Sequence, residues 1–223
     1  EEQGANEYPI EERKKAVTQM NKILGDPNRL AVIAKDFIEH YEKRIEEGST
    51  ICGKAMFVCS SREIAYDLYK QIVALRPEWE EKIGSEDQTP VERIRLVMTR
   101  EKDDDPKLRE LIGSDEDRKA LDVLFKNPDS NFKIAIVVSM WTTGFDVPCL
   151  DTMYIDKPLQ KHTLVQTISR VNRVYEGKDK GLVVDYIGIK SNMNNALKQY
   201  AGGGDMGDNV ETIEQSVTMV KDE

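Results

Sequence analysis

The residues best suited to chemistry lie between positions 140 and 175. The second half of this stretch has an apolar stripe at helical spacing, formed by Leu164, Ile168, Val171 and Tyr175. On the opposite face of that predicted helix lie Gln166, Arg170 and Arg173. A guanidinium group can hold phosphate oxygens through two parallel hydrogen bonds, so Arg170 and Arg173 are candidate phosphate ligands. The alternative is an ordinary solvated face with surface arginines.

A turn with a glycine and an aspartate precedes that helix. The β-branched run KIAIVVS at residues 133–139 predicts a buried strand, and MWTTGFDVP follows it. A glycine permits a tight backbone turn, and Asp146 could cap the turn or accept a ligand hydroxyl. Open α/β sheets bind ligands at the carboxyl ends of their strands. We therefore expect Thr143, Gly144 and Asp146 at such an end.

Two further strand ends carry polar residues. Ser60, Ser61 and Arg62 follow the apolar residues 55–59, and Thr99 follows the predicted strand at 93–98. Serine hydroxyls commonly cap the helix that starts beside them. Hydroxyls, arginines and helix N-termini are also the usual ligands of a DNA backbone. The sequence leaves both roles open for these residues.

One motif has the pattern of a nucleotide-binding loop without its context. GSTICGKA at residues 48–55 fits G-x-x-x-x-G-K, but Ala55 stands where a P-loop has Ser or Thr to hold Mg²⁺. A P-loop also joins a strand to a helix, whereas here a helical pattern precedes and an apolar strand follows. We therefore expect a helix-to-strand loop. An independent nucleotide hydrolase built on this loop remains an alternative, which turnover by the isolated chain would support.

Helical and strand patterns alternate along the chain. Asp26 and Pro27 predict the start of one helix, and the acids at 115–117 predict the start of another. The order of patterns indicates an α/β fold with a mostly parallel sheet and helices on both faces. We expect residues 101–114 to form a long, mobile loop with room for a short helix, and residues 10–24, 191–200 and 210–223 to be helical.

Composition limits the class of protein. The 223 residues have a net charge of −9 and 33% charged residues, which suits a globular core with highly charged helices. This acidity counts against autonomous DNA binding but allows local phosphate contacts. Three cysteines without a C-x-x-C pair indicate reduced thiols and a cytoplasmic protein, and two distant histidines predict no metal site. No apolar run is long enough for a membrane span, and the start Glu-Glu-Gln suggests a piece of a longer protein.

The same motifs carry a family resemblance. TTGFDVP resembles motif V, and QTISRVNR resembles motif VI, of superfamily 2 helicases and translocases, although motif VI usually has Gly or Ala where this chain has Ser169. With TMYIDKPL and VVDYIGI, they closely resemble the second motor domain of the R subunit of type I restriction-modification enzymes. KAMFVCSSREIAYDLY resembles motif IV of that subunit, and the resemblance covers about residues 29–200.

The resemblance implies a RecA-like fold and roles for the candidate residues. Residues 51–200 would form the RecA-like helicase C-terminal domain, after a helical lead-in at 1–50 and before a glycine-rich linker and the start of a C-terminal segment at 201–223. In the related motors ATP lies between two such domains, and the first binds most of the ATP and Mg²⁺. The implied arginine fingers are Arg170 and Arg173, and the implied ATP-binding residues are Gly144, Asp146 and Gln166. The implied DNA-facing residues are Ser60, Ser61, Arg62, Thr99 and Thr143.

The implied function is ATP-dependent translocation along double-stranded DNA by one half of a motor. This fragment alone is expected to be inactive, and DNA cleavage would belong to a nuclease domain that these 223 residues do not contain. The implied partners are DNA, the first motor and nuclease domains of the same chain, and the methylation and specificity subunits, with no membrane. Two alternatives remain: the motor domain of another superfamily 2 DNA or RNA helicase, and a non-catalytic interaction module of the same fold.

Overall fold

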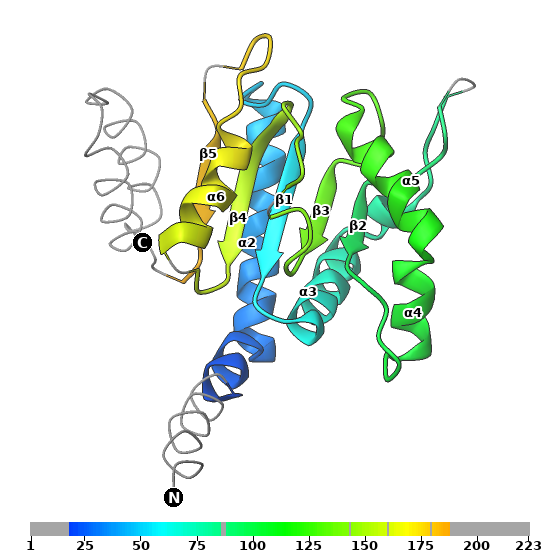
Figure 1. The fold of residues 1–223 in the computed structure, drawn as a ribbon, viewed down its shortest axis with the longest axis vertical. Helices are drawn as coiled ribbons and strands as arrows, with labels where there is room; N and C mark the ends of the chain where they lie inside the picture. Colours follow the sequence, from blue (N-terminus) through cyan, green and yellow to red (C-terminus); the bar gives the residue numbers. More distant parts are fainter. Residues whose placement is uncertain (1–17, 86–87, 143, 160, 179, 188–223) are drawn as a thin grey trace, which may run out of the picture.

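The sheet is built from apolar strands that all run in parallel. The computed structural model describes residues 18–85, 88–142, 144–159, 161–178 and 180–187. Within them the strands are β1 (Lys54–Cys59), β2 (Ile94–Val97), β3 (Ile134–Val137), β4 (Leu150–Asp156) and β5 (Leu182–Asp185). They lie in the order β2-β3-β1-β4-β5, so β1 is central (Figure 1).

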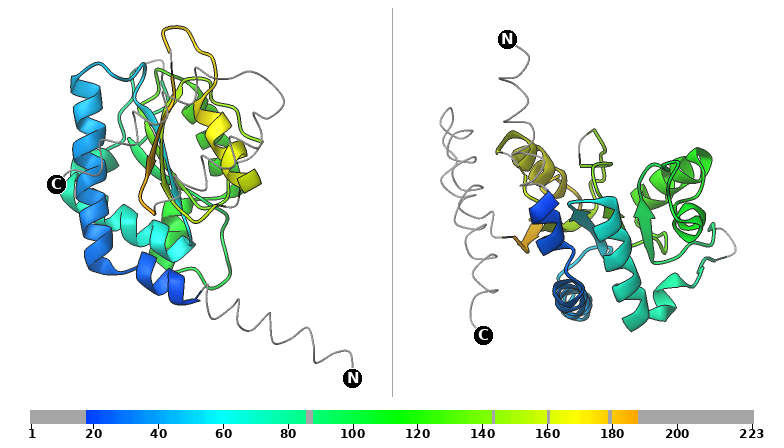
Figure 2. Two further views of the ribbon diagram at one scale, coloured as in Figure 1. Left: turned by 90° about the vertical axis from the view of Figure 1, so that its left-hand side faces the viewer. Right: turned by 90° about the horizontal axis from the view of Figure 1, so that it is seen from below.

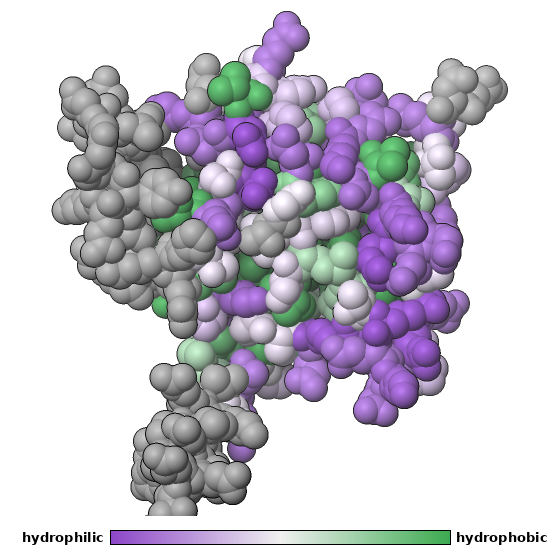
Figure 3. Space-filling view, viewed as in Figure 1, coloured by the Kyte–Doolittle hydropathy of each residue, from purple (hydrophilic) through white to green (hydrophobic). Residues whose placement is uncertain are grey.

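Helices cover both faces of this sheet, as predicted. Besides residues 18–24, the described helical segments are α2 (Pro27–Glu46), α3 (Arg62–Leu75), the 3-10 helix η1 (Pro77–Glu80), α4 (Pro106–Ile112), α5 (Asp115–Lys126) and α6 (Lys161–Val171). Figure 2 shows α2 and α3 on one face and α5 and α6 on the other. Hydrophilic side chains gather over α4 and α5 in Figure 3. The parallel sheet between two helical layers is the RecA-like α/β fold.

Alternate residues of β1 point into two separate cores. Phe57 packs with Phe37 of α2 and Tyr154 of β4, and all three side chains are buried. Met56 and Val58 join the opposite core, which α5 and α6 cover. This alternation follows from the two-residue period of a strand. Both faces of β1 are therefore apolar, which explains its continuous hydrophobic run.

Polar side chains start the helices at the predicted positions. The Asp26 carboxylate accepts from the backbone N–H groups of Asn28 and Arg29 at 3.0 Å each, and Pro27 opens α2. Ser114 and Asp117 form a capping box at the start of α5, so the acids at 115–117 open a helix. Capping by short polar side chains satisfies N–H groups that have no partner within the helix.

The structure corrects the end of one predicted helix. The predicted helix through Tyr175 is too long, because α6 ends at Val171. The chain must turn there to enter β5: Lys178 N bonds to Tyr175 O at 2.9 Å, and Gly181 lies against the Val171 carbonyl. The short helix expected within residues 101–114 is α4, which an aspartate N-cap and a proline begin.

Parts of the sequence prediction fall outside the described residues. The expected helices at 191–200 and 210–223 lie there, and the expected helix at 10–24 is described only from residue 18. The division into 1–50, 51–200 and 201–223 remains a prediction. Within the described residues, α2 shares a core with β1 although the predicted boundary lies between them.

Candidate functional site

Aromatic side chains anchor the loop that follows β3. Trp141 has a φ of 63°, which bulky L-residues rarely adopt. Its ring stacks on Phe145 with 4.1 Å between centroids, and both side chains are buried. Gly144 between them has a φ of 72° with open space around it, a conformation that glycine adopts without steric cost. The two rings hold the loop while Gly144 and Asp146 face solvent.

Asp146 and Arg173 meet on the surface beside this loop. Arg173 Nε lies 3.3 Å from Asp146 Oδ1, and the two side chains are 48% and 57% exposed. Arg173 follows the end of α6 instead of lying on its polar face, so the predicted clustering on one helix face is wrong for this residue. An exposed ion pair contributes about 0–1 kcal/mol. Both groups are therefore accessible to a ligand at little energetic cost.

Arg170 lies in the last turn of α6 and is half-buried. Its Nε is buried and has no hydrogen-bond partner within the described part of the chain. A buried donor without a partner costs about 1–3 kcal/mol. One turn earlier, the backbone carbonyl of Gln166 accepts from Ser169 Oγ at 2.7 Å, and the Gln166 side chain is half-buried. Of the predicted ATP-facing residues, the structure brings Arg173 and Asp146 into direct contact.

The direction of α6 decides where these residues lie. The helix leaves the carboxyl end of β4 and leads to the amino end of β5 (Figure 1). Arg173, two residues after the end of α6, therefore lies toward the amino edge of the sheet. Leu164, Ile168 and Val171 hold the helix in the core, as predicted. Asp146 was predicted at a carboxyl edge. That prediction is wrong because the chain after β3 must return to the start of β4, and Asp146 lies on this return.

The predicted DNA-facing residues lie at the other edge of the sheet. Ser61 caps α3 through a bond from Ile64 N at 3.3 Å, which confirms its capping role. Arg62 donates to the Thr99 carbonyl and to Asp104 Oδ1. Its side chain therefore links the segment that follows β1 to the loop that follows β2. Thr143 lies outside the described residues.

Neighbouring carboxylates and burial reduce the charge and the accessibility of these DNA-facing groups. Asp104 lies 2.5 Å from Arg62, and Glu101 lies 3.4 Å from it. Burial opposes ionisation of Asp104, but the Glu101 backbone N–H and the Arg62 guanidinium outweigh it and lower the pKa of that carboxyl. Ser60 Oγ is buried without a hydrogen-bond partner among the described residues. Arg62 therefore offers a DNA phosphate less charge than its residue type suggests.

Lys157 is a polar residue at this edge that the sequence analysis missed. Its ammonium group donates to Val138 O at 2.6 Å and to Ser139 Oγ at 3.3 Å, which ties the end of β4 to the end of β3. Burial lowers the pKa of Lys157. The available signal was its position directly after an apolar strand, equivalent to that of Ser60.

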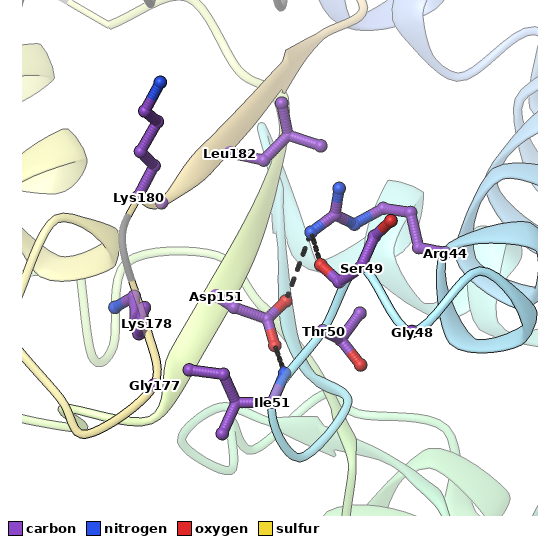
Figure 4. A pocket seen from close by; sticks show the side chains of 11 residues that line it. Arg44, Gly48, Ser49, Thr50, Ile51, Asp151, Gly177, Lys178, Lys180 and Leu182 are labelled. Carbon is purple, nitrogen blue, oxygen red and sulfur yellow. Dashed lines mark hydrogen bonds and ion pairs between the residues drawn. The ribbon is translucent and has the colours of Figure 1, made fainter.

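The G-x-x-x-x-G-K match forms no phosphate cradle. As predicted, it joins α2 to β1. Lys54 is fully buried and donates to Phe132 O at 2.5 Å, and burial lowers the pKa of its ammonium group to about 8. The loop instead lines a pocket of about 390 Å³ at the amino edge, together with Arg44, Asp151 and Lys178 (Figure 4). Arg44 lies 3.9 Å from Asp151 there.

The described residues contain neither a membrane-spanning helix nor a cluster of metal ligands. No described helix has the length and apolar character needed to cross a membrane. No group of His, Cys, Asp and Glu side chains in the described ranges could hold a metal ion.

The family model and the relatives found by sequence agree on one family. The family described as type I restriction enzyme subunit R domain 3 matches residues 110–188. The type I restriction enzyme HindI endonuclease subunit of Haemophilus influenzae is 40% identical over 209 residues, which are 91% of this chain and 19% of that protein. The SauCOLORF180P endonuclease subunit of Staphylococcus aureus strain COL is 31% identical over 180 residues, which are 75% of this chain and 17% of that protein.

A solved structure shares the fold. It is a fragment from Vibrio vulnificus YJ016 assigned to the HsdR subunit of a type I restriction enzyme, with a TM-score of 0.56 and 14% identity. The match covers 77% of this chain and 30% of that one. The chain spans less than a fifth of the length of the curated relatives above. The chain belongs to the family of type I restriction enzyme R subunits, of which it forms a RecA-like domain.

Proposed function

We propose that this chain is the second motor domain of an R subunit that uses ATP to translocate double-stranded DNA. Arg170 and Arg173 would contact the γ-phosphate of a nucleotide whose cradle and Mg²⁺ ligands come from a first motor domain. The carrying observation is the accessible pair of Asp146 and Arg173; Arg173 lies three residues after Arg170, whose Nε has no partner in the described part of the chain. Such guanidinium groups suit phosphate oxygens geometrically.

The remaining residues of this surface support the same assignment. Phosphoryl transfer depends on positioning and on neutralising charge at the transferred group. Asp146 would hold Arg173 near its working position through the 3.3 Å contact. Gly144 would present the loop backbone to the nucleotide, because it is exposed and a Cβ there would meet open space among the described residues. Gln166 would assist from α6, one turn before Arg170.

A separate edge of the sheet is available for DNA. Ser60, Ser61, Arg62 and Thr99 follow the carboxyl ends of β1 and β2, whereas Arg173 lies toward the amino edge. Two surfaces on one domain allow nucleotide state and DNA position to be coupled by movement of the whole domain. Arg62 is already paired with Asp104 and Ser60 Oγ is buried, so backbone groups would make much of the phosphate contact. The remaining partners would be the nuclease domain and the methylation and specificity subunits.

The decisive experiment replaces each arginine in the full-length parent protein. An arginine finger contributes about 10³–10⁵ in rate, so Arg170→Ala and Arg173→Ala should lower DNA-stimulated ATP turnover by about that factor. Arg173→Ala removes only an exposed ion pair, so the free energy of unfolding should change by less than about 1 kcal/mol. The isolated chain should show no turnover.

Arg109→Ala is the matched control. Arg109 is exposed on α4, which packs beside β2 (Figure 1). β2 is the outermost strand on one side of the sheet, whereas α6 connects β4 and β5 on the opposite side. Its replacement should leave turnover unchanged. A loss of less than about tenfold in both test variants would show that Arg170 and Arg173 are structural.

A further inference from the structure

Two cysteines far apart in the sequence are neighbours before β1 and β4. Lys54 of β1 pairs in register with Leu150 of β4. Cys52 lies two residues before Lys54, and Cys149 lies directly before Leu150. Cys52 Sγ is 3.5 Å from the Cys149 carbonyl oxygen, to which it donates. Adjacent strands are about 4.8 Å apart, which is compatible with the Cα separation of a disulfide.

A solvent pocket leads to this pair. Cys52 is half-buried and lines a pocket of about 340 Å³ together with Tyr41, Arg93 and Lys133. Cys149 is 1% exposed and lies behind it. A water-sized oxidant can therefore approach Cys52 from solvent, with Cys149 within the reach of one side chain.

Buried positive charge stabilises a thiolate at this position. The Lys54 ammonium group is fully buried and donates to the carbonyls of Phe132 and Leu124, and no carboxylate pairs with it within the described residues. The Cys52 side chain beside the Cys149 sulfur lowers the pKa of Cys149 to about 7, against the effect of burial and with help from the Lys54 ammonium group. The Cys149 side chain, followed by burial, raises the pKa of Cys52. One proton is thus shared by the pair, and the thiolate fraction is large near neutral pH.

We propose that Cys52 and Cys149 form a redox-sensitive thiol pair that hydroperoxides convert to an intramolecular disulfide. The Cys52 thiol, which faces the pocket, passes its proton to the Cys149 thiolate and attacks one oxygen of the peroxide; the O–O bond breaks, and the released hydroxide takes up a proton to become water. The Cys149 sulfur then attacks the Cys52 sulfenic acid, forms the S–S bond and releases a second water with the Cys149 proton. The thiol pair loses two electrons to the peroxide, so the step is balanced.

The disulfide would act on the loop that carries the candidate nucleotide-facing residues. Cys149 lies directly after residues 144–148, which include Gly144 and Asp146. Bonding Cys149 to Cys52 fixes the end of that loop to the segment before the central strand β1. The third cysteine, Cys59, lies at the other end of β1 and is fully buried, so it stays reduced.

Peptide mapping of the folded chain tests the proposal, because trypsin separates the three cysteines. Cys52 falls in residues 45–54, Cys59 in 55–62 and Cys149 in 134–161. The chain is treated with hydrogen peroxide, blocked with iodoacetamide and digested without reductant. We expect a cross-linked peptide of 45–54 with 134–161, lighter by about 2 Da than the two reduced peptides together. Peptide 55–62 should stay unmodified by peroxide.

Three variants separate the steps. Cys149→Ser should trap a sulfenic acid on Cys52 that a dimedone probe labels, with no cross-link. Cys52→Ser should lower the rate of peroxide consumption at least tenfold. Cys59→Ser is the matched control and should cross-link as the parent does. Absence of the 45–54 to 134–161 cross-link in the folded parent, or equal oxidation of Cys59, would overturn the proposal.

Discussion

Replacing Arg29 tests the ion pair that joins α2 to the end of β4. Arg29 Nη1 lies 3.0 Å from Asp156 Oδ2, and Nη2 contacts Oδ1. The Asp156 side chain is fully buried, whereas that of Arg29 is 23% exposed. Arg29 Nη1 also donates to Leu24 O at 2.9 Å. The guanidinium therefore connects two helical segments and the strand that leads into α6.

Arg29→Met leaves a buried carboxylate without its counter-ion. Removing one partner of a buried pair costs about 3–5 kcal/mol. Methionine keeps an unbranched, helix-compatible side chain, and the N-cap contacts of Asp26 use only backbone N–H groups, so the loss reports the ion pair. We expect the free energy of unfolding to fall by about 3–5 kcal/mol. Lys35→Met is the control, because the Lys35–Glu39 pair is 73% and 65% exposed and should contribute less than about 0.5 kcal/mol.

Urea unfolding followed by tryptophan fluorescence measures both variants. Trp79 and Trp141 are buried and will report the loss of the core. With a slope of about 2 kcal/mol per molar urea, the Arg29→Met midpoint should fall by about 2 M. The double variant Arg29→Met with Asp156→Leu should recover most of the loss, because an apolar pair needs no counter-ion. A shift of Arg29→Met no larger than that of Lys35→Met would refute the reasoning.

Two further predictions concern α6 and α2. A Cβ on Gly181 would lie 2.1 Å from the Val171 carbonyl oxygen, so Gly181→Ala should cost about 1–3 kcal/mol or more in thermal unfolding. Gly144→Ala, with open space but a φ of 72°, should cost only about 1 kcal/mol, and equal losses would contradict the packing argument. Burial, and after it the charge of Arg44, lowers the pKa of His40 from its usual 6.5. Below about pH 6.5 the unfolded chain therefore binds more protons than the folded chain, and the free energy of unfolding should decrease as the pH is lowered. His40→Gln should make the urea midpoint depend less on pH between about pH 5 and 8. An unchanged dependence in this variant would contradict the role given to His40.

The element types and their order were predictable because each rests on local patterns. Residues 134–138 and 55–59 are apolar because β3 and β1 are covered on both faces. Asp26 and Pro27 predicted the start of α2 because capping depends on adjacent backbone groups. The resemblance in motifs V and VI likewise depends on contiguous residues, and family membership agrees with it.

The candidate site was predictable in residue type but not in arrangement. Arg170 lies in α6 as expected, whereas Arg173 lies beyond its end, where it pairs with Asp146. Helical periodicity continues in the sequence after Val171, so it cannot show that β5 must start nearby. The end of α6 depends on where the chain has to turn, and that is a property of the sheet order.

The amino-acid sequence by itself determined the strands, most helices, the parallel α/β class and the residues suited to phosphate. Only the tertiary structure decided that Arg62 is neutralised by Asp104, that Arg29 pairs with Asp156 across 127 positions, and that Cys52 meets Cys149 across 97. The physical reason is distance along the chain. Secondary structure follows from neighbours a few residues apart, whereas ion pairs and thiol contacts depend on which strands lie side by side.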